Sequence, residues 1–433
     1  MKETGMNMAQ NRMVASDVRR LRELAGRIRE LAEGERNRRL VNRWYALDEG
    51  RADRPLILAE TDGGLNMVAP DLRPLCQEEW ARQREWGMLG VILHHQTLSD
   101  DSPVEPCVSV PWRISVVKGS GWDFEIKHAY PEGAFAEKTA FHIEPPIKDL
   151  AAELDRVVGR HCTLRVDREG TLAELAQLEE VFGGILQVRL RGNPWWTQGL
   201  TQTAIDLIGL ENLMVYMYEQ PEALHALLAF LADANIRRVQ WMEREGLLCL
   251  NNEDDYTGSG SRGYTHALPQ AGFQEGRPRA RDLWCLMESQ ETVGVGPDQY
   301  EDFVFREEQR VAALFGRVYV GCCEPLHTRW DVIKRMPNLK RVSVSPWCDQ
   351  RFMAEAMGAD YVFSRKPNPA LISGPVFDAS LIRNDLRQTM DLTKAHGCPT
   401  EIIMKDVHTL AAEPWRLARW VALARETAEE VYG

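Results

Sequence analysis

The chain has 433 residues, of which 44% are apolar and 27% are charged, a composition typical of a globular protein with a large core. Its formal net charge of −12 argues against a nucleic-acid-binding surface, which needs clustered lysine and arginine. Residues 1–14 lack the apolar core of a signal peptide, and no apolar run approaches the length of a membrane span. We therefore expect a cytoplasmic protein that acts on small molecules or binds protein partners, without nucleic acid or membrane.

The first helical pattern covers residues 17–47, where apolar residues recur at helical spacing among many charges. This pattern predicts an exposed amphipathic arm over residues 1–50, ahead of a main domain at 51–433. The arm is also a candidate contact for a homodimer.

Short β-branched runs then alternate with longer helical segments. The runs are 55–60, 89–95, 185–190, 247–252, 283–291, 317–324, 341–346, 361–366 and 401–406. Such alternation predicts an α/β fold with a parallel sheet, and eight or nine strands favour a distorted (β/α)8 barrel of the TIM type over an open sheet. Within 96–180, the segment 108–130 indicates antiparallel strands around a Gly-Ser-Gly turn, so we expect a β insertion there.

Several strand runs become polar at their carboxyl ends, which in a barrel meet on the active-site face. Three successive runs end with candidate metal ligands, namely Glu288, then Cys322 or Cys323, then Cys348. One carboxylate and two thiolates with an open fourth position form a catalytic zinc arrangement. No CxxC or HExxH spacing accompanies them, so cysteines simply buried at strand ends are the alternative interpretation.

Side-chain alternation along a strand provides a preference between the adjacent cysteines. If Val318 and Val320 face the surrounding helices, Cys322 faces them too, whereas Tyr319 and Cys323 face the barrel axis. Cys323 is therefore the preferred ligand, with Cys322 as its alternative.

Other strand ends supply candidate substrate-binding and proton-transfer groups. Residues 258–263 match GxGxxG without a following helix, so we expect a mobile lid instead of a dinucleotide site. Asp406 and His408 fit the D-x-H-x-x-G pattern of corrinoid-binding domains, but the final glycine is missing. The predicted substrate-binding residues are Asn251, Asn252, Tyr256, Tyr264, Gln290, Trp347 and Arg365, and the predicted catalytic residues are Glu324, Lys405 and His408.

Five blocks, at 250–270, 288–305, 319–349, 361–370 and 401–410, resemble the uroporphyrinogen decarboxylase superfamily, especially its methyltransferase-like branch. The resemblance spans roughly residues 180–433 and implies a distorted (β/α) barrel with one large cleft. No Arg-x-Ala-Gly-Arg block of the decarboxylases occurs before residue 90. Gly321 stands where the His-x-Cys zinc motif of thiol methyltransferases has histidine.

The resemblance therefore favours the Glu, Cys, Cys zinc pattern of demethylases that act on aryl methyl ethers, matched here by Glu288, Cys323 and Cys348. It implies a zinc-dependent methyltransferase that passes a methyl group from a small methylated substrate to a separate corrinoid protein. The alternatives are a metal-free decarboxylase-like lyase and a noncatalytic accessory protein that binds corrinoid or a partner.

Overall fold

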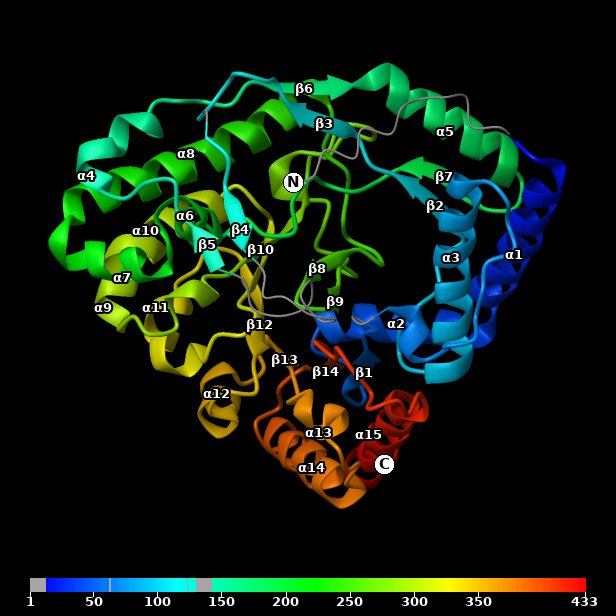
Figure 1. The fold of residues 1–433 in the computed structure, drawn as a ribbon. Helices are drawn as coiled ribbons and strands as arrows, with labels where there is room; N and C mark the ends of the chain where they lie inside the picture. Colours follow the sequence, from blue (N-terminus) through cyan, green and yellow to red (C-terminus); the bar gives the residue numbers. More distant parts are fainter. Residues whose placement is uncertain (1–12, 62–63, 123, 130–141) are drawn as a thin grey trace.

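The computed structural model describes residues 13–61, 64–122, 124–129 and 142–433 (Figure 1). Its central feature is a six-stranded sheet in the order β1-β14-β13-β12-β11-β10, in which every neighbouring pair is parallel. The strands are β1 (Leu56–Ala59), β10 (Trp284–Met287), β11 (Arg317–Val320), β12 (Leu339–Val344), β13 (Val362–Arg365) and β14 (Thr400–Met404). Each overlaps a run that the sequence predicts as a strand, so the predicted α/β class with a parallel sheet is confirmed.

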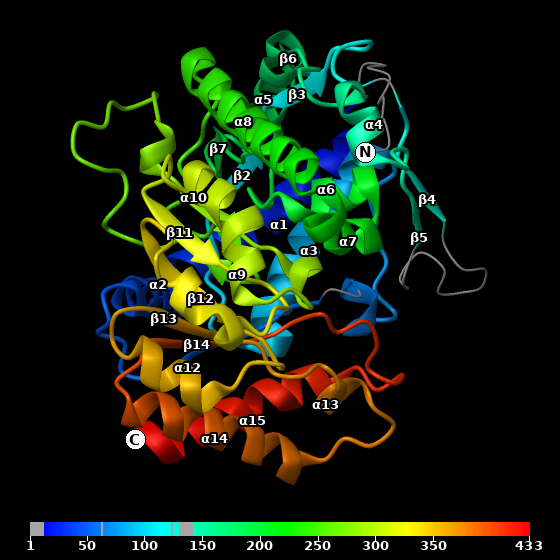
Figure 2. The same ribbon diagram turned by 90° about the vertical axis from the view of Figure 1, so that its left-hand side faces the viewer.

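Helices cover the outside of this sheet (Figure 2), which explains why its strands are almost continuously apolar and buried. Among the described residues the longer helices are α1 (Ala15–Glu33), α2 (Glu35–Asp48), α3 (Glu79–Leu93), α5 (Arg168–Phe182), α6 (Thr201–Ile208), α7 (Leu210–Glu219), α8 (Pro221–Glu245), α10 (Arg306–Ala312), α12 (Gln350–Met357), α14 (Ala379–Ala395) and α15 (Trp415–Tyr432). Short helices are α4 (Leu150–Glu153), α9 (Pro297–Gln299), α11 (Trp330–Ile333) and α13 (Ala370–Ser373). No helix in the described part of the chain is both long and apolar enough to cross a lipid bilayer.

A second parallel pair, β2 (Cys107–Val110) with β7 (Gln187–Leu190), stands apart from the six-stranded sheet. The predicted strand at 247–252 forms no ladder in the structure. Its Asn251 side chain instead bonds the backbone N–H and carbonyl of Trp284 at 2.8 and 3.0 Å, at the amino end of β10. The parallel strands of the described residues therefore form one sheet of six and one separate pair, without the closed ladder of an eight-stranded barrel.

The segment at 89–95 is helical, so its prediction as a strand is wrong. It contains the end of α3 and the start of the π-helical turn η2 (His94–Leu98). Met88, Leu89 and Ile92 are buried in the same cluster as α1 residues, because their spacing fits a helix face as well as a strand.

Antiparallel strands occupy much of the predicted insertion. β3 (Arg113–Val116) pairs with β6 (Leu164–Asp167), and β4 (Lys127–Ala129) pairs with β5 (His142–Glu144). The antiparallel prediction is thus correct for these pairs, but β2, from the same segment, runs parallel to β7.

The N-terminal helices are packed into the fold. Leu21 and Ile28 of α1 are buried with Phe182 of α5, and Trp44 of α2 is fully buried with its indole N–H donating to the Asp101 carbonyl at 2.8 Å. The prediction of amphipathic helices that pack through one apolar stripe and expose their polar faces is therefore correct for α1 and α2.

A short hairpin, β8 (Tyr256–Gly258) and β9 (Ser261–Arg262), lies in the middle of the ring of strands and helices (Figure 1). Thr257, Ser259 and Ser261 are buried. A Cβ added to Gly258 would lie 2.6 Å from the Tyr319 ring, so only glycine allows this close approach. The burial of these hairpin residues argues against the predicted mobile lid, because the hairpin packs against the sheet.

Replacing Gly258 with alanine should destabilise the protein by about 1–3 kcal/mol, because the new methyl group overlaps Tyr319 and Leu286. Gly276→Ala is the matched control, since Gly276 also has a positive φ but has open space around its Cα. It should cost about 1 kcal/mol from backbone strain alone. Urea unfolding of both variants measures the difference, and equal midpoints would contradict the packed hairpin.

Candidate functional site

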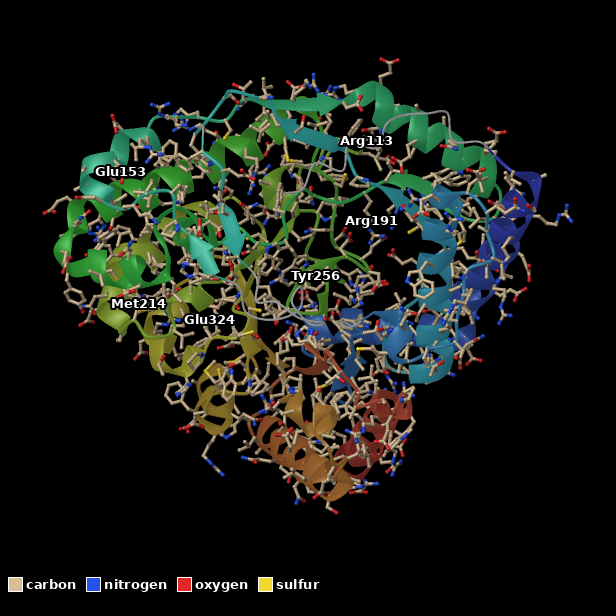
Figure 3. The ribbon with its side chains drawn as sticks, in the orientation of Figure 1. Arg113, Glu153, Arg191, Met214, Tyr256 and Glu324 are labelled. Atoms are coloured by element: carbon tan, nitrogen blue, oxygen red, sulfur yellow. The ribbon has the colours of Figure 1, made fainter. Side chains whose placement is uncertain are left out.

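Three neighbouring parallel strands, β10, β11 and β12, end beside one another at one edge of the sheet. Glu288 follows β10, residues 321–324 follow β11, and Cys348 lies shortly after β12. The predicted zinc ligands are thus carried by adjacent strand ends. Figure 3 shows Glu324 in this region and Tyr256 on the hairpin beside it.

The carboxylate of Glu324 fastens two of these strand ends together. It accepts hydrogen bonds from the backbone N–H of Ser289 at 2.8 Å and of Cys322 at 2.5 Å, and its side chain is almost fully buried. Charge-assisted bonds of this kind are stronger than neutral ones. Glu324 therefore holds the loop after β11 against the loop after β10, instead of presenting a free proton donor as predicted.

Glu288 is a buried carboxyl group with unused hydrogen-bonding capacity. Its Oε2 accepts a long bond from the Gln290 N–H at 3.5 Å, whereas the buried Oε1 has no partner. Burial, together with the nearby Glu291, Glu324 and Cys322, raises the pKa of Glu288 to about 9. A carboxyl group in this condition is a candidate ligand or proton carrier.

The two adjacent thiols point toward each other, with 3.7 Å between the sulfur atoms. Cys322 is buried and lies 3.9 Å from the Ser259 hydroxyl of the hairpin, so it faces the interior. The predicted outward orientation of Cys322 is wrong, because β11 ends at Val320 and Gly321 has φ +91°. Strand alternation does not continue through such a turn.

The thiol pair is chemically asymmetric. The bond from Cys322 lowers the pKa of Cys323 and raises that of Cys322. Cys323 is only half-buried and has the lower pKa of the two, so it carries the negative charge more readily. Lys405 lowers the pKa of both thiols through its positive charge.

Cys348 is held in a different environment. Its thiol donates to the main-chain carbonyl of Glu324 at 3.5 Å and contacts the Ser345 hydroxyl at 3.7 Å, and burial raises its pKa. Among the described residues, no three His, Cys, Asp or Glu side chains are gathered closely enough to hold a metal ion. The predicted combination of Glu288, Cys323 and Cys348 is therefore not assembled in this structure.

Two buried lysines, Lys366 and Lys405, contribute positive charge to the site. Lys366 donates to the Tyr319 hydroxyl at 2.9 Å and to the Ser364 carbonyl at 3.0 Å. Burial lowers the pKa of Lys366 to about 7, and the charge of Lys405 acts in the same direction. Burial also disfavours the ammonium of Lys405, yet Cys322, Asp406 and Tyr256 outweigh it and raise the pKa of Lys405. One lysine thus stays charged at neutral pH while the other titrates there.

Some predicted substrate-binding residues lie elsewhere. Asn251 and Asn252 bond backbone groups of Trp284 and Leu268, away from the carboxyl edge of the sheet. Tyr264 is buried against Trp44, with ring centroids 6.2 Å apart.

The remaining predicted residues differ in exposure and contacts. Arg365 uses its guanidinium to bind the main-chain carbonyls of Val344 and Ser345, which gives it a structural role. Trp347 is 65% exposed, His408 is exposed and Gln290 is half-buried. Tyr256 is 45% exposed and interacts electrostatically with Lys405, so it is the predicted aromatic residue that the structure brings to the thiols.

Ser259 and the lowered pKa of Lys366 are features that sequence reasoning missed. Ser259 reaches Cys322 only because the hairpin folds into the centre of the ring, and no local pattern encodes that. Lys366 had a usable signal, since a lysine directly after a buried strand is a candidate for a lowered pKa.

Comparisons with known proteins add little to this geometry. No protein-family model matches the chain, and no curated protein matches it. Among solved structures, a methyltransferase from Methanosarcina mazei is similar, with a TM-score of 0.48 and 13% sequence identity over 89% of this chain and 98% of that one.

Glu288→Gln should stabilise the metal-free protein increasingly as the pH rises. The folded-state pKa is raised above the ordinary 4.5 to about 9, so the stability that goes with the protonated carboxyl is complete below pH 4.5 and is lost as the pH rises through about 9. Melting temperatures measured with a chelator at pH 5 and pH 9 test this. Glu30→Gln, on the exposed face of α1, controls for the loss of one charge, and a constant difference for Glu288→Gln would contradict the buried-acid assignment.

Glu324→Gln should cost about 1–3 kcal/mol of unfolding free energy, because an amide –NH2 would face a backbone N–H that now has an acceptor. Chemical denaturation measures the loss. The control is Glu301→Gln, which removes an exposed carboxylate paired with Arg335 at 2.7 Å and should cost less than about 1 kcal/mol. Equal costs for the two variants would show that Glu324 does not fasten the strand ends.

Proposed function

We propose that the chain is a zinc-dependent methyltransferase that takes a methyl group from a small methylated oxygen compound, such as an aryl methyl ether, and passes it to a separate corrinoid protein. The observation that supports this most is the thiol pair of Cys322 and Cys323 at the end of β11, next to the strand whose end carries Glu288 with its unpartnered carboxyl oxygen. The resemblance of the sequence blocks to the methyltransferase-like branch supplies the reaction class.

The spacing of the thiols supports a shared metal ion. Two thiolates at about 2.3 Å from a tetrahedral zinc lie roughly 3.8 Å apart. The sulfur atoms of Cys322 and Cys323 are separated by 3.7 Å. We therefore favour both cysteines as ligands, instead of one of them together with Cys348.

Glu288 is the third ligand in this proposal. Its Oε1 has no hydrogen bond to lose if the side chain shifts toward the thiols, and Glu288 already interacts electrostatically with Cys322. Metal binding would replace the proton on this carboxyl group and would balance the negative charge that burial disfavours. Cys348, bonded to the Glu324 carbonyl, then has a structural role.

Bound zinc would act as a Lewis acid that polarises the substrate oxygen, which is otherwise a poor leaving group. The rest of the chemistry falls to the chain's own residues. When the methyl–oxygen bond breaks, the oxygen keeps the electron pair and needs stabilisation and finally a proton. The charged Lys405 stabilises the negative charge on this oxygen. Lys366, which is protonated in part near neutral pH, can donate the proton.

The hairpin offers a surface for a planar substrate. Tyr256 stands partly exposed near Lys405, where its ring can stack on an aromatic ether. We further propose that residues 247–252 and the β2–β7 pair complete a distorted barrel around this hairpin. The strand ends with Cys322 and Glu288 then share one face with Tyr256.

Purified protein should bind about one zinc per chain, and Cys322→Ser, Cys323→Ser and Glu288→Ala should each lose it, with affinity reduced by more than about 100-fold. Cys348→Ser is the matched control and should keep its zinc. Plasma mass spectrometry after dialysis gives the content. Zinc that is lost in Cys348→Ser but retained in Cys322→Ser would contradict this ligand set.

The reaction itself is tested with free cob(I)alamin as the acceptor and an aryl methyl ether as the donor. The wild type should convert the cob(I)alamin absorption spectrum to that of methylcobalamin, and the zinc-free variants should not. Zinc-bound wild type that fails with a panel of methyl ethers would reject this substrate class. Folded protein that takes up no zinc would favour the metal-free lyase or the accessory protein.

A further inference from the structure

A cavity of about 410 Å³ lies between α2, the segment before β1, and α15. Figure 1 shows α2 directly above α15 in this region. Five arginines line it, and three carboxylates face them. The arginines are Arg36, Arg39, Arg43, Arg54 and Arg425, and the carboxylates are Asp53, Asp101 and Glu429. The chain as a whole carries −12, so this local positive excess runs against its composition.

The positive charge is least compensated in the inner part of the cavity. Arg54 pairs with Asp101 at 2.7 Å, and Arg425 shares the same carboxylate at 3.2 Å. The Nε of Arg425 is buried and has no hydrogen-bond partner. The buried carboxylate of Asp101 is thus shared by the guanidinium groups of Arg54 and Arg425.

Arg36 has neutral partners. Its guanidinium bonds the His95 ring at 3.0 Å and the Asp100 carbonyl at 3.0 Å, and no carboxylate of the described residues is within ion-pair distance of it. Burial lowers the pKa of Arg36 and the charge of Arg425 lowers it further, which Asp100 and Asp101 offset only in part. These two guanidinium groups therefore repel each other.

The two outer arginines of the cavity, Arg39 and Arg43, are held only by exposed ion pairs. Arg39 pairs with Glu35 at 2.6 Å and Arg43 pairs with Asp53 at 3.1 Å, and all four side chains are exposed. Exposed pairs contribute little to stability, so both guanidinium groups can turn to a ligand at small cost. Planar guanidinium groups bind phosphate oxygens in bidentate geometry.

We propose that this cavity binds a small anion that carries phosphate groups. Arg36 and Arg425 form its floor and Arg39 and Arg43 close over it from α2. Arg54 precedes β1, so the site lies at the amino end of that strand, away from the carboxyl edge that bears Cys322. It does not depend on the proposed methyl transfer, and a ligand there would act from a distance or anchor the protein.

The test is isothermal titration of the full chain with inorganic pyrophosphate at constant ionic strength. The wild type should show saturable binding of one ligand per chain. Arg36→Gln and the exposed variant Arg43→Gln should each weaken it about tenfold, through the loss of charge-assisted hydrogen bonds. Asp53→Asn frees Arg43 from its carboxylate and should tighten binding several-fold, which a misfolded variant cannot do.

The matched control is Arg387→Gln, which removes an exposed arginine of α14 that pairs with Glu430 of α15 outside the cavity. Its affinity for pyrophosphate should equal that of the wild type. Absence of saturable binding to the wild type, or an equal loss in Arg43→Gln and Arg387→Gln, would overturn the proposal.

Discussion

The buried guanidinium of Arg341 is the constraint that the centre of the molecule depends on. It extends from β12 to the Ser261 hydroxyl of the hairpin at 2.6 Å, lies 4.8 Å from the centroid of the Trp284 ring, and has Asp48 of α2 and Glu401 of β14 within 4 Å. A buried charge is tolerated only with such partners, and removing one partner of a buried pair costs several kcal/mol. The hairpin, the sheet and the N-terminal helices therefore cannot separate without exposing or orphaning this charge.

The hairpin that Arg341 holds also positions residues of the candidate site. It carries Ser259, which touches Cys322, and Tyr256, which lies near Lys405. Glu324 adds a second fastening by joining the ends of β10 and β11. The acid, the thiol pair and the lysines are thus held by the rigid parts of the fold, as a preorganised site requires.

Much of the sheet could be predicted from sequence because its strands are buried on both faces and their apolar runs end at polar residues. The antiparallel pairs of the insertion and the two N-terminal helices also follow from local periodicity. The segment at 89–95 could not be assigned, since Met88, Leu89 and Ile92 suit a helix face in the α1 cluster as well as a strand. Its helical state is decided by tertiary packing.

The candidate site, too, could be predicted only in part from the sequence. Sequence position places Glu288, Cys322 and Cys348 at neighbouring strand ends, which the structure confirms. The directions of the Cys322 and Cys323 side chains depend on Gly321, whose positive φ interrupts the alternation on which the preference for Cys323 rests. Asn251 begins a polar stretch and Tyr264 follows a glycine-rich one, and both stretches resemble binding loops, yet the partners of these residues are distant backbone groups and Trp44. Such long-range contacts leave no mark in local sequence.

The claim that Cys322 and Cys323 bind one metal ion together is tested most directly by zinc K-edge X-ray absorption on the zinc-loaded protein. Two sulfur atoms should lie at about 2.3 Å from the zinc, with oxygen or nitrogen atoms completing the shell, and Cys322→Ser loaded with excess zinc to offset its lower affinity should show one sulfur fewer. A first shell without sulfur, or one unchanged in both Cys322→Ser and Cys323→Ser, would contradict it.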